Sequence, residues 1–201
     1  MHHPTFAHPM HRLLLFASGQ GSNAEAIIRY FNEAGSAEVI GIVCNKVGAG
    51  VISMAAREGI NTMLIDRAAF TADDFPRRIQ AHAPDLIVLA GFLWKIPQAL
   101  VEAFHGRIIN LHPALLPKYG GKGMWGRHVH EAVLTAGEKE SGITVHRVNE
   151  HYDEGDILLQ ARCPVLPGDD ASALAARIQG LEHFYLPRCV EAVLAGLHEK
   201  G

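Results

Sequence analysis

Two polar side chains close one short apolar run of the chain. Residues 108–111 are apolar except for Asn110, and His112 follows them directly. Side chains at i and i+2 of an extended chain project to the same face, so Asn110 and His112 can point at one atom. An amide donates without ionising, and an imidazole exchanges a proton near neutral pH. The pair therefore suits an oxyanion, although taken alone it also fits a strand-end turn with a satisfied, buried imidazole.

An acidic loop further along the chain supplies candidate carboxylates. Residues 151–156 contain Asp153, Glu154 and Asp156, with Gly155 allowing a sharp turn. A carboxylate beside an imidazole favours the charged imidazolium and can itself accept a proton. We expect one of these carboxylates to keep His112 protonated. The acids of such a loop, considered without the histidine, are equally consistent with solvated turn residues.

A glycine-rich turn near the start of the chain has the pattern of a phosphate site. Residues 18–23 read Ser-Gly-Gln-Gly-Ser-Asn between an apolar run and a helical pattern. Glycines permit close approach of the backbone to a ligand, and the free N–H groups at a helix start favour an anion. With Ala24 the segment also satisfies the G-x-G-x-x-A dinucleotide pattern, which keeps a nicotinamide-dependent oxidoreductase open. That interpretation needs an acid after the second strand, where Asn45 and Lys46 stand instead.

Two plainer interpretations of this turn also remain. Its glycines could serve turn geometry alone, with Ser22 or Asn23 capping the helix. A domain that binds a phosphosugar without catalysis is a further alternative.

The elements that carry these residues alternate between strand and helix. Five short runs are apolar at consecutive positions, as in strands covered on both faces: residues 13–17, 39–44, 62–65, 86–89 and 108–111. Ala24, Ile27, Ile28 and Phe31 form one helical stripe between the first two runs. This alternation predicts an α/β fold with a doubly wound, mostly parallel sheet.

The pattern changes after residue 112. A glycine-rich loop through Gly126 and a helix over residues 130–136 precede two β-like runs, at residues 143–148 and 157–165, which we expect to pair antiparallel. The chain then closes with a helix from Ala171 that we expect to be interrupted near Pro187.

Composition narrows the function classes. The 201 residues predict a flexible, histidine-rich segment at residues 1–11 and a single domain at residues 12–201. A net charge of −3 and apolar runs far shorter than a membrane span argue against nucleic acid and membrane partners, and favour a small-molecule substrate. Three cysteines without a C-x-x-C pair argue against a disulfide framework and a zinc site, and indicate the cytoplasm. The oligomeric state is left open, a homodimer included.

Six segments together resemble the folate-dependent formyltransferase family, and within it the enzymes that formylate glycinamide ribonucleotide. The resemblance covers residues 12–195 and is carried by LLLFASGQGSNAEAII, CNKVGAG, PDLIVLAGF, RIINLHPALLPKYGG, SGITVHRVNEHYDEGDILLQ and RIQGLEHFYLP. It implies a Rossmann-like fold and transfer of the formyl group of 10-formyltetrahydrofolate to the amine of 5'-phosphoribosylglycinamide in de novo purine biosynthesis. It implies no metal and no tightly bound cofactor.

The resemblance also assigns residues. Asn110, His112 and Asp153 look like the family's catalytic residues, with His112 protonated. The phosphate and glycinamide end of the substrate is assigned to Gly21, Ser22, Asn23, Gln179 and Glu182. The folate pocket is assigned to Leu93, Trp94, Lys95, Ile96, Asn110, Val148, Asn149, Glu150, His151, Tyr152 and Asp153.

The chain departs from the family pattern at three places. Ala114 stands where the family often has Ser, Trp94 stands where a basic residue is common, and residues 122–126 look like a short insertion. Relatives that act on transfer RNA or hydrolyse formylfolate carry further domains, which do not fit in 201 residues. Sugar-amine formyltransferases share the core, so another phosphorylated or nucleotide-sugar amine remains an alternative acceptor.

Overall fold

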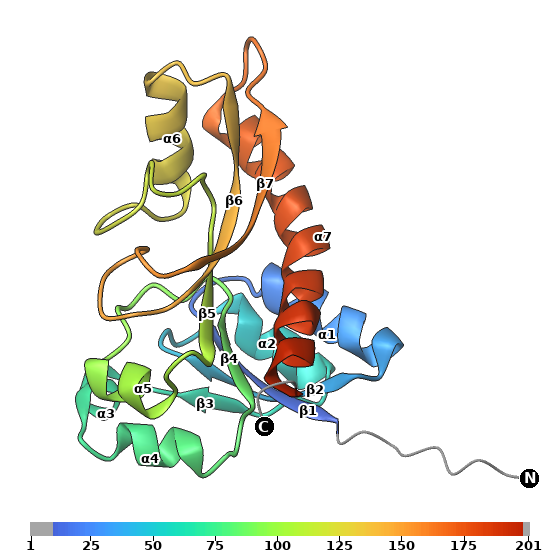
Figure 1. Ribbon diagram of the computed structural model, residues 1–201, viewed down its shortest axis with the longest axis vertical. Coiled ribbons are helices and arrows are strands. Elements are labelled where there is room, and N and C mark those ends of the chain that lie inside the picture. Colours follow the sequence, from blue (N-terminus) through green and yellow to red (C-terminus); the bar gives the residue numbers. More distant parts are fainter. Residues whose placement is uncertain (1–9, 199–201) are drawn as a thin grey trace, which may run out of the picture.

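The computed structural model describes residues 10–198 (Figure 1). Most of the segment expected to be flexible, residues 1–9, lies outside the described residues. His11 already belongs to the first strand, so the described domain starts one residue earlier than expected.

One sheet of seven strands runs through the molecule. The strands are β1 His11–Ala17, β2 Ala37–Cys44, β3 Thr62–Leu64, β4 Leu86–Leu89, β5 Ile108–His112, β6 Glu140–Arg147 and β7 Ile157–Pro164. Their order across the sheet is β3-β2-β1-β4-β5-β6-β7. The first five strands pair parallel, while β6 pairs antiparallel with both β5 and β7. The doubly wound, mostly parallel sheet and its antiparallel addition are thus confirmed.

Helices cover both faces of the sheet (Figure 1). They are α1 Ser22–Ala34, α2 Gly50–Arg57, α3 Arg67–Thr71, α4 Phe75–Gln80, α5 Gln98–Ala103, α6 Arg127–Thr135 and α7 Ala171–His198. Alternate residues of β1 show why its apolar run is continuous: Leu13 and Leu15 pack in the core beneath α1, α2 and α7, while Leu14 and Phe16 pack beneath α3, α4 and α5. Apolar surface is therefore buried on both sides of the central strands.

The last helix differs from the expectation. α7 runs from Ala171 to His198 with Pro187 inside it, so the interruption expected at the proline is wrong. Proline removes one backbone donor from a helix. Here Leu186, Val190 and Leu194 are buried against the core, and this packing holds the helix together through Pro187.

The strand order places the site. The chain winds outward from β1 to β2 and β3, then returns to the other side of β1 with β4. In sheets of this kind the ligand crevice lies at the carboxyl ends of the strands where the winding reverses. The loops after β1 and β4 are joined there, because Ser18 N donates to Gly91 O over 3.1 Å and Leu93 N donates to Ser18 Oγ over 3.0 Å. The glycine-rich turn and the folate segment are consequently neighbours.

Two further observations concern the cysteines and the apolar character of the helices. Cys44, Cys163 and Cys189 are buried free thiols. No helix within residues 10–198 is both long enough and apolar enough to cross a membrane.

Candidate active site

The main pocket lies at the carboxyl ends of the parallel strands, where the crevice was expected, and has a volume of about 890 Å³. It brings together most of the residues assigned from the sequence, which come from α1, β5, the loops after β4 and β6, and α7. The assigned residues that line it are Asn23, Leu93, Trp94, Lys95, Ile96, Asn110, His112, Val148, Asn149, His151, Tyr152, Asp153, Gln179 and Glu182. Gly21, Ser22 and Glu150 do not line this pocket.

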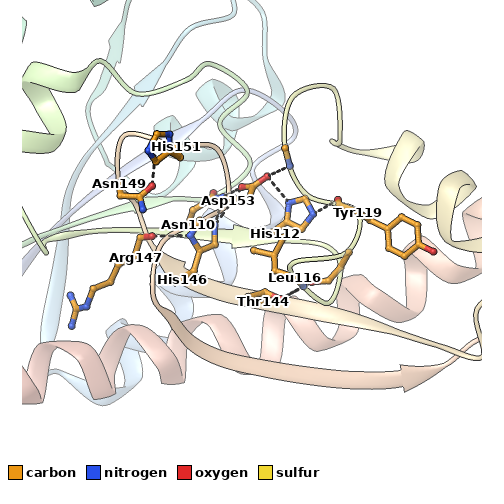
Figure 2. Close-up of polar contacts among 12 residues, drawn as sticks. Asn110, His112, Leu116, Tyr119, Thr144, His146, Arg147, Asn149, His151 and Asp153 are labelled. Carbon is orange, nitrogen blue, oxygen red and sulfur yellow. Dashed lines mark hydrogen bonds and ion pairs between the residues drawn. The ribbon is translucent and has the colours of Figure 1, made fainter.

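Asn110 and His146 are cross-strand neighbours at the centre of the pocket. The β5–β6 register pairs the two residues, and Asn110 Nδ2 lies 3.2 Å from His146 Nε2. His146 Nδ1 lies 2.8 Å from the Arg147 carbonyl oxygen, which can only accept, so Nδ1 carries a proton. In the neutral ring, Nε2 is then an acceptor for the Asn110 amide. This arrangement orients Asn110 with its N–H₂ group toward His146 and Asp153 (Figure 2).

His112 is held between a backbone carbonyl and a carboxylate. Its Nε2 donates to the Tyr119 carbonyl oxygen over 2.7 Å, and its Nδ1 lies 3.5 Å from Asp153 Oδ2. Burial lowers the pKa of His112, and the raising effects of the Asp153 charge and of the Tyr119 carbonyl do not outweigh it. The expectation that Asp153 keeps His112 protonated is therefore wrong for the protein by itself. The ring is neutral near pH 7, with its proton on Nε2.

Asp153 connects the three other polar groups (Figure 2). Its Oδ1 accepts from Asn110 Nδ2 over 3.3 Å and lies 3.4 Å from His146 Nε2, while its Oδ2 accepts from Gly121 N over 2.9 Å. Burial would raise the pKa of Asp153, but His146, the charge of His112 and the Gly121 amide outweigh burial and lower it. The group is a carboxylate whose oxygens face Asn110, both imidazoles and the Gly121 amide.

Two constrained loops hold these side chains in place. Tyr119 and Asp153 both adopt positive φ angles, of 57° and 56°, which non-glycine residues take up rarely. Gly155 closes the neck of the acidic loop, since a Cβ there would lie 1.8 Å from the Arg147 carbonyl oxygen. Strained backbone of this kind gathers at functional sites, where the surrounding structure must hold it. We take the two loops as the support that fixes His112 and Asp153.

The phosphate turn has the local structure expected of an anion site. Gly21 is the N-cap of α1 with φ 89°, and the helix start has no side-chain cap, so capping by Ser22 or Asn23 does not occur. Asn23 Nδ2 instead donates to Glu182 Oε2 over 2.8 Å, and Gln179 Nε2 donates to Ser22 Oγ over 3.2 Å. Burial raises the pKa of Glu182, which the hydrogen bond from Asn23 partly opposes. All five residues assigned to the phosphorylated end thus lie at one junction of α1 with α7.

Trp94 and Ala114 are the two positions at which the sequence led us to expect a departure from the family pattern. Trp94 lines the pocket, yet its ring also packs on Phe70 at 5.3 Å and lies beneath the Arg67 guanidinium at 4.1 Å. At position 94, where the resemblance led us to expect a basic side chain, an aromatic ring therefore lies with a cation on its face. Ala114 is fully buried, and its carbonyl accepts from Thr144 Oγ1 over 2.7 Å.

Several pocket residues were missed by sequence reasoning. His146, His130, Met124 and Trp125 all line the pocket. One signal for His146 was available, because Thr144 and His146 are polar at i and i+2 of residues 143–146, which are otherwise apolar, as Asn110 and His112 are of residues 108–112. Within residues 10–198 no group of three or more His, Cys, Asp or Glu side chains is placed to hold a metal ion.

Known proteins share both the sequence pattern and the fold. The chain matches the formyl transferase family over residues 11–190. It is 36% identical to phosphoribosylglycinamide formyltransferase of Escherichia coli (strain K12) over 94% of this chain and 91% of that protein. It is 37% identical to the trifunctional purine biosynthetic protein adenosine-3 of Drosophila pseudoobscura pseudoobscura over 94% of this chain but only 14% of that longer protein. The crystal structure of glycinamide ribonucleotide transformylase 1 from Symbiobacterium toebii superposes with a TM-score of 0.85 at 32% identity, covering 94% of this chain and 90% of that one.

Proposed function

The chain belongs to the formyl transferase family, and we propose that it transfers the formyl group of 10-formyltetrahydrofolate to the amine of 5'-phosphoribosylglycinamide. The products are N-formylglycinamide ribonucleotide and tetrahydrofolate, a step of de novo purine biosynthesis in the cytoplasm. One observation carries the proposal: Asn110, His112 and Asp153 meet in a pocket that also receives Asn23, Gln179 and Glu182 from the anion-binding end. The chemistry moves no electrons between substrates, so it needs no redox cofactor.

The proposed reaction begins with attack of the neutral amine on the formyl carbon. A new C–N bond forms, and negative charge develops on the former carbonyl oxygen while the attacking nitrogen becomes positive. We propose that the Asn110 amide faces that oxygen, joined by His112 once this ring is protonated, and a donor placed in advance there is worth about 3 to 4 kcal/mol of barrier. The amine must then lose a proton before the bond to N10 breaks.

His112 and Asp153 are proposed to receive that proton as a pair. Neutral His112 has its lone pair on Nδ1, 3.5 Å from Asp153 Oδ2, so a proton taken up here is shared between an imidazole and a carboxylate. The imidazolium forms only when the oxyanion forms, which pairs the two charges inside the buried site. The same proton is returned to N10 of the folate as it leaves, so the protein ends the reaction in its original state.

Asn110 is coupled to this proton transfer. Both hydrogens of its amide are engaged, one by His146 Nε2 and one by Asp153 Oδ1. The bond to Asp153 weakens once the carboxylate shares a proton. That hydrogen can then turn to the oxyanion. The amide therefore donates most strongly in the transition state, which is what accelerates a reaction.

A direct assay tests the proposal. Mixing the protein with 10-formyltetrahydrofolate and phosphoribosylglycinamide should change the folate absorbance with one folate released per formylated product. Nicotinamide dinucleotides should neither bind nor react, since no acid follows β2 to hold a ribose. Absence of transfer to this amine, with transfer to a nucleotide-sugar amine, would assign the chain to the other branch of the family.

A further inference from the structure

His130 is a buried imidazole that makes no hydrogen bond to the part of the chain that the structure describes. It lies in α6, is 5% exposed, and its Nδ1 is buried without a hydrogen bond. Neither ring nitrogen makes a hydrogen bond or an ion pair within residues 10–198. The other two buried histidines of the pocket, His112 and His146, have a polar atom near each nitrogen. Buried polar groups are almost always satisfied, so an imidazole of the pocket that makes no hydrogen bond needs an explanation.

The position of His130 points to one end of the pocket. His130 lines the pocket together with Ala175 and Gln179 of α7, and α6 packs against α7. In Figure 1, α6 lies beside β6, and the first turns of α7 lie against β6 and β7. The folate segments at residues 93–96 and 148–153 come from other loops of the sheet. His130 is thus associated with the helix that supplies Gln179 and Glu182, the residues assigned to the phosphorylated substrate.

The chemistry of the ring determines what it can bind. Burial lowers the pKa of His130, and the nearby His112 lowers it further, so the ring is neutral near pH 7. A neutral imidazole carries one N–H and one lone pair. An unpaired buried N–H is rarer than an unpaired acceptor, which places the proton on Nε2 rather than on the buried Nδ1. Nδ1 has no accessible surface, so a ligand reaches the ring at its Nε2 edge, where it meets a donor.

We propose that His130 is a substrate-binding residue whose Nε2–H donates to an oxygen of the phosphorylated acceptor. This inference rests on the proposed function and adds a recognition group to it. The ribose hydroxyls, the amide carbonyl and the phosphate of that substrate all offer acceptor oxygens. Within residues 10–198 this Nε2–H has no partner, so the hydrogen bond is made only when the acceptor is bound, while Nδ1 stays buried and unpaired.

Two variants and two ligands test the proposal. His130→Phe keeps a planar ring but removes the donor, so calorimetric titration should show a Kd for phosphoribosylglycinamide raised by about fivefold or more. The Kd for a non-reactive folate analogue should not change. His130→Gln retains an N–H donor and should recover most of the affinity. The thermal midpoint of His130→Phe should equal or exceed that of the wild type, since an unsatisfied buried nitrogen has been removed.

His128 is the matched control. It lies in the same helix, is exposed, and packs edge-on to Trp125 at 5.3 Å. His128→Phe should leave both Kd values unchanged. A His130→Phe protein that binds the phosphorylated substrate as tightly as wild type overturns the inference, as does an equal loss of folate affinity. If His130→Phe fails to fold, His130→Leu is measured in its place and judged by the same Kd. Wild-type protein that transfers no formyl group overturns the proposed function instead, so the two failures are distinguishable.

Discussion

Asn110 Nδ2 lies 3.2 Å from His146 Nε2, across the antiparallel pair that joins β5 to β6. The register of the two strands, rather than the loop after β5, thus decides which way the Asn110 amide points. His146, which lies in β6 and in neither the loop after β5 nor the acidic loop, therefore helps to orient the Asn110 amide.

Asn110→Ala should lower kcat by about a hundredfold or more, within the range for loss of an oxyanion donor. The KM values should change much less, because the amide is expected to act mainly in the transition state. Steady-state rates from folate absorbance measure both constants. A folded variant whose kcat stays near that of the wild type would show that Asn110 does not face the oxyanion.

Asp153→Asn should lower turnover by at least about a hundredfold, because the amine's proton loses its acceptor pair. Asn tolerates the positive φ of this position, so the loop should keep its course. Binding of the phosphorylated substrate should change little, since its phosphate is assigned to residues 21–23.

The same loop provides controls for Asp153. Glu154 and Asp156 are exposed and share the loop's charge. Glu154→Gln and Asp156→Asn should keep most of the activity. If either is as damaging as Asp153→Asn, the loop acts through its net charge or the wrong carboxylate has been chosen.

Glu182→Gln should raise the KM for phosphoribosylglycinamide by about tenfold or more, the usual cost of losing a hydrogen bond to a charged group. The KM for the folate should not move. The variant should unfold at the same or a higher temperature, because burial disfavours the ionised Glu182 side chain. Glu25→Gln, on the surface of α1, is the comparison. Equal changes in both KM values would indicate a purely structural carboxylate.

The free energy of unfolding should fall as the pH is lowered from 7.5 to 5.5. The folded-state pKa of His112 is below its ordinary value of 6.5, so in that window the unfolded chain binds the proton more readily and acid favours unfolding. One such group contributes a slope of at most about 1.4 kcal/mol per pH unit. Urea titrations at several pH values should show a shallower slope for His112→Gln. An unchanged slope would contradict the assigned pKa direction.

Trp94 should report on folate binding. The chain has 2 tryptophans, so Trp125→Phe leaves Trp94 as the single emitter. If the pocket-facing part of the Trp94 ring contacts the folate, emission should change on titration with a folate analogue, and phosphoribosylglycinamide alone should have a smaller effect. A silent titration would mean that the ring serves only to pack against Phe70 and Arg67.

Local patterns predicted the elements well, because each depends on neighbouring residues. The run at residues 86–89 has the same bounds as β4. The strand expected at residues 108–111 is one residue longer in the structure and ends at His112. The meeting of Asn110 with Asp153 was expected only from the family resemblance, which singled out Asp153 among the acids of its loop. His146 was missed because its role depends on the β5–β6 register, which joins residues far apart in sequence.

Properties set by burial were harder to predict. The charge of His112 was expected from a carboxylate that does lie near it, yet desolvation by the surrounding core dominates. Pro187 was expected to break a helix on local grounds, but long-range packing of Leu186 and Val190 decides the outcome. His130 gave no signal, because an unsatisfied nitrogen is visible only when every neighbour is placed.

The hydrogen bond from Asn23 to Glu182 joins residues 159 positions apart, and this has a consequence for synthesis. Domains emerge from the ribosome from the N-terminus at about 5 to 20 residues per second. The first helix is therefore complete long before α7 is made, and the apolar surfaces of α1, β6 and β7 that α7 covers stay exposed until then. Folding of this domain is expected to be completed only after the whole of α7 has left the ribosome, with the exposed sheet face in need of protection by chaperones in the interval.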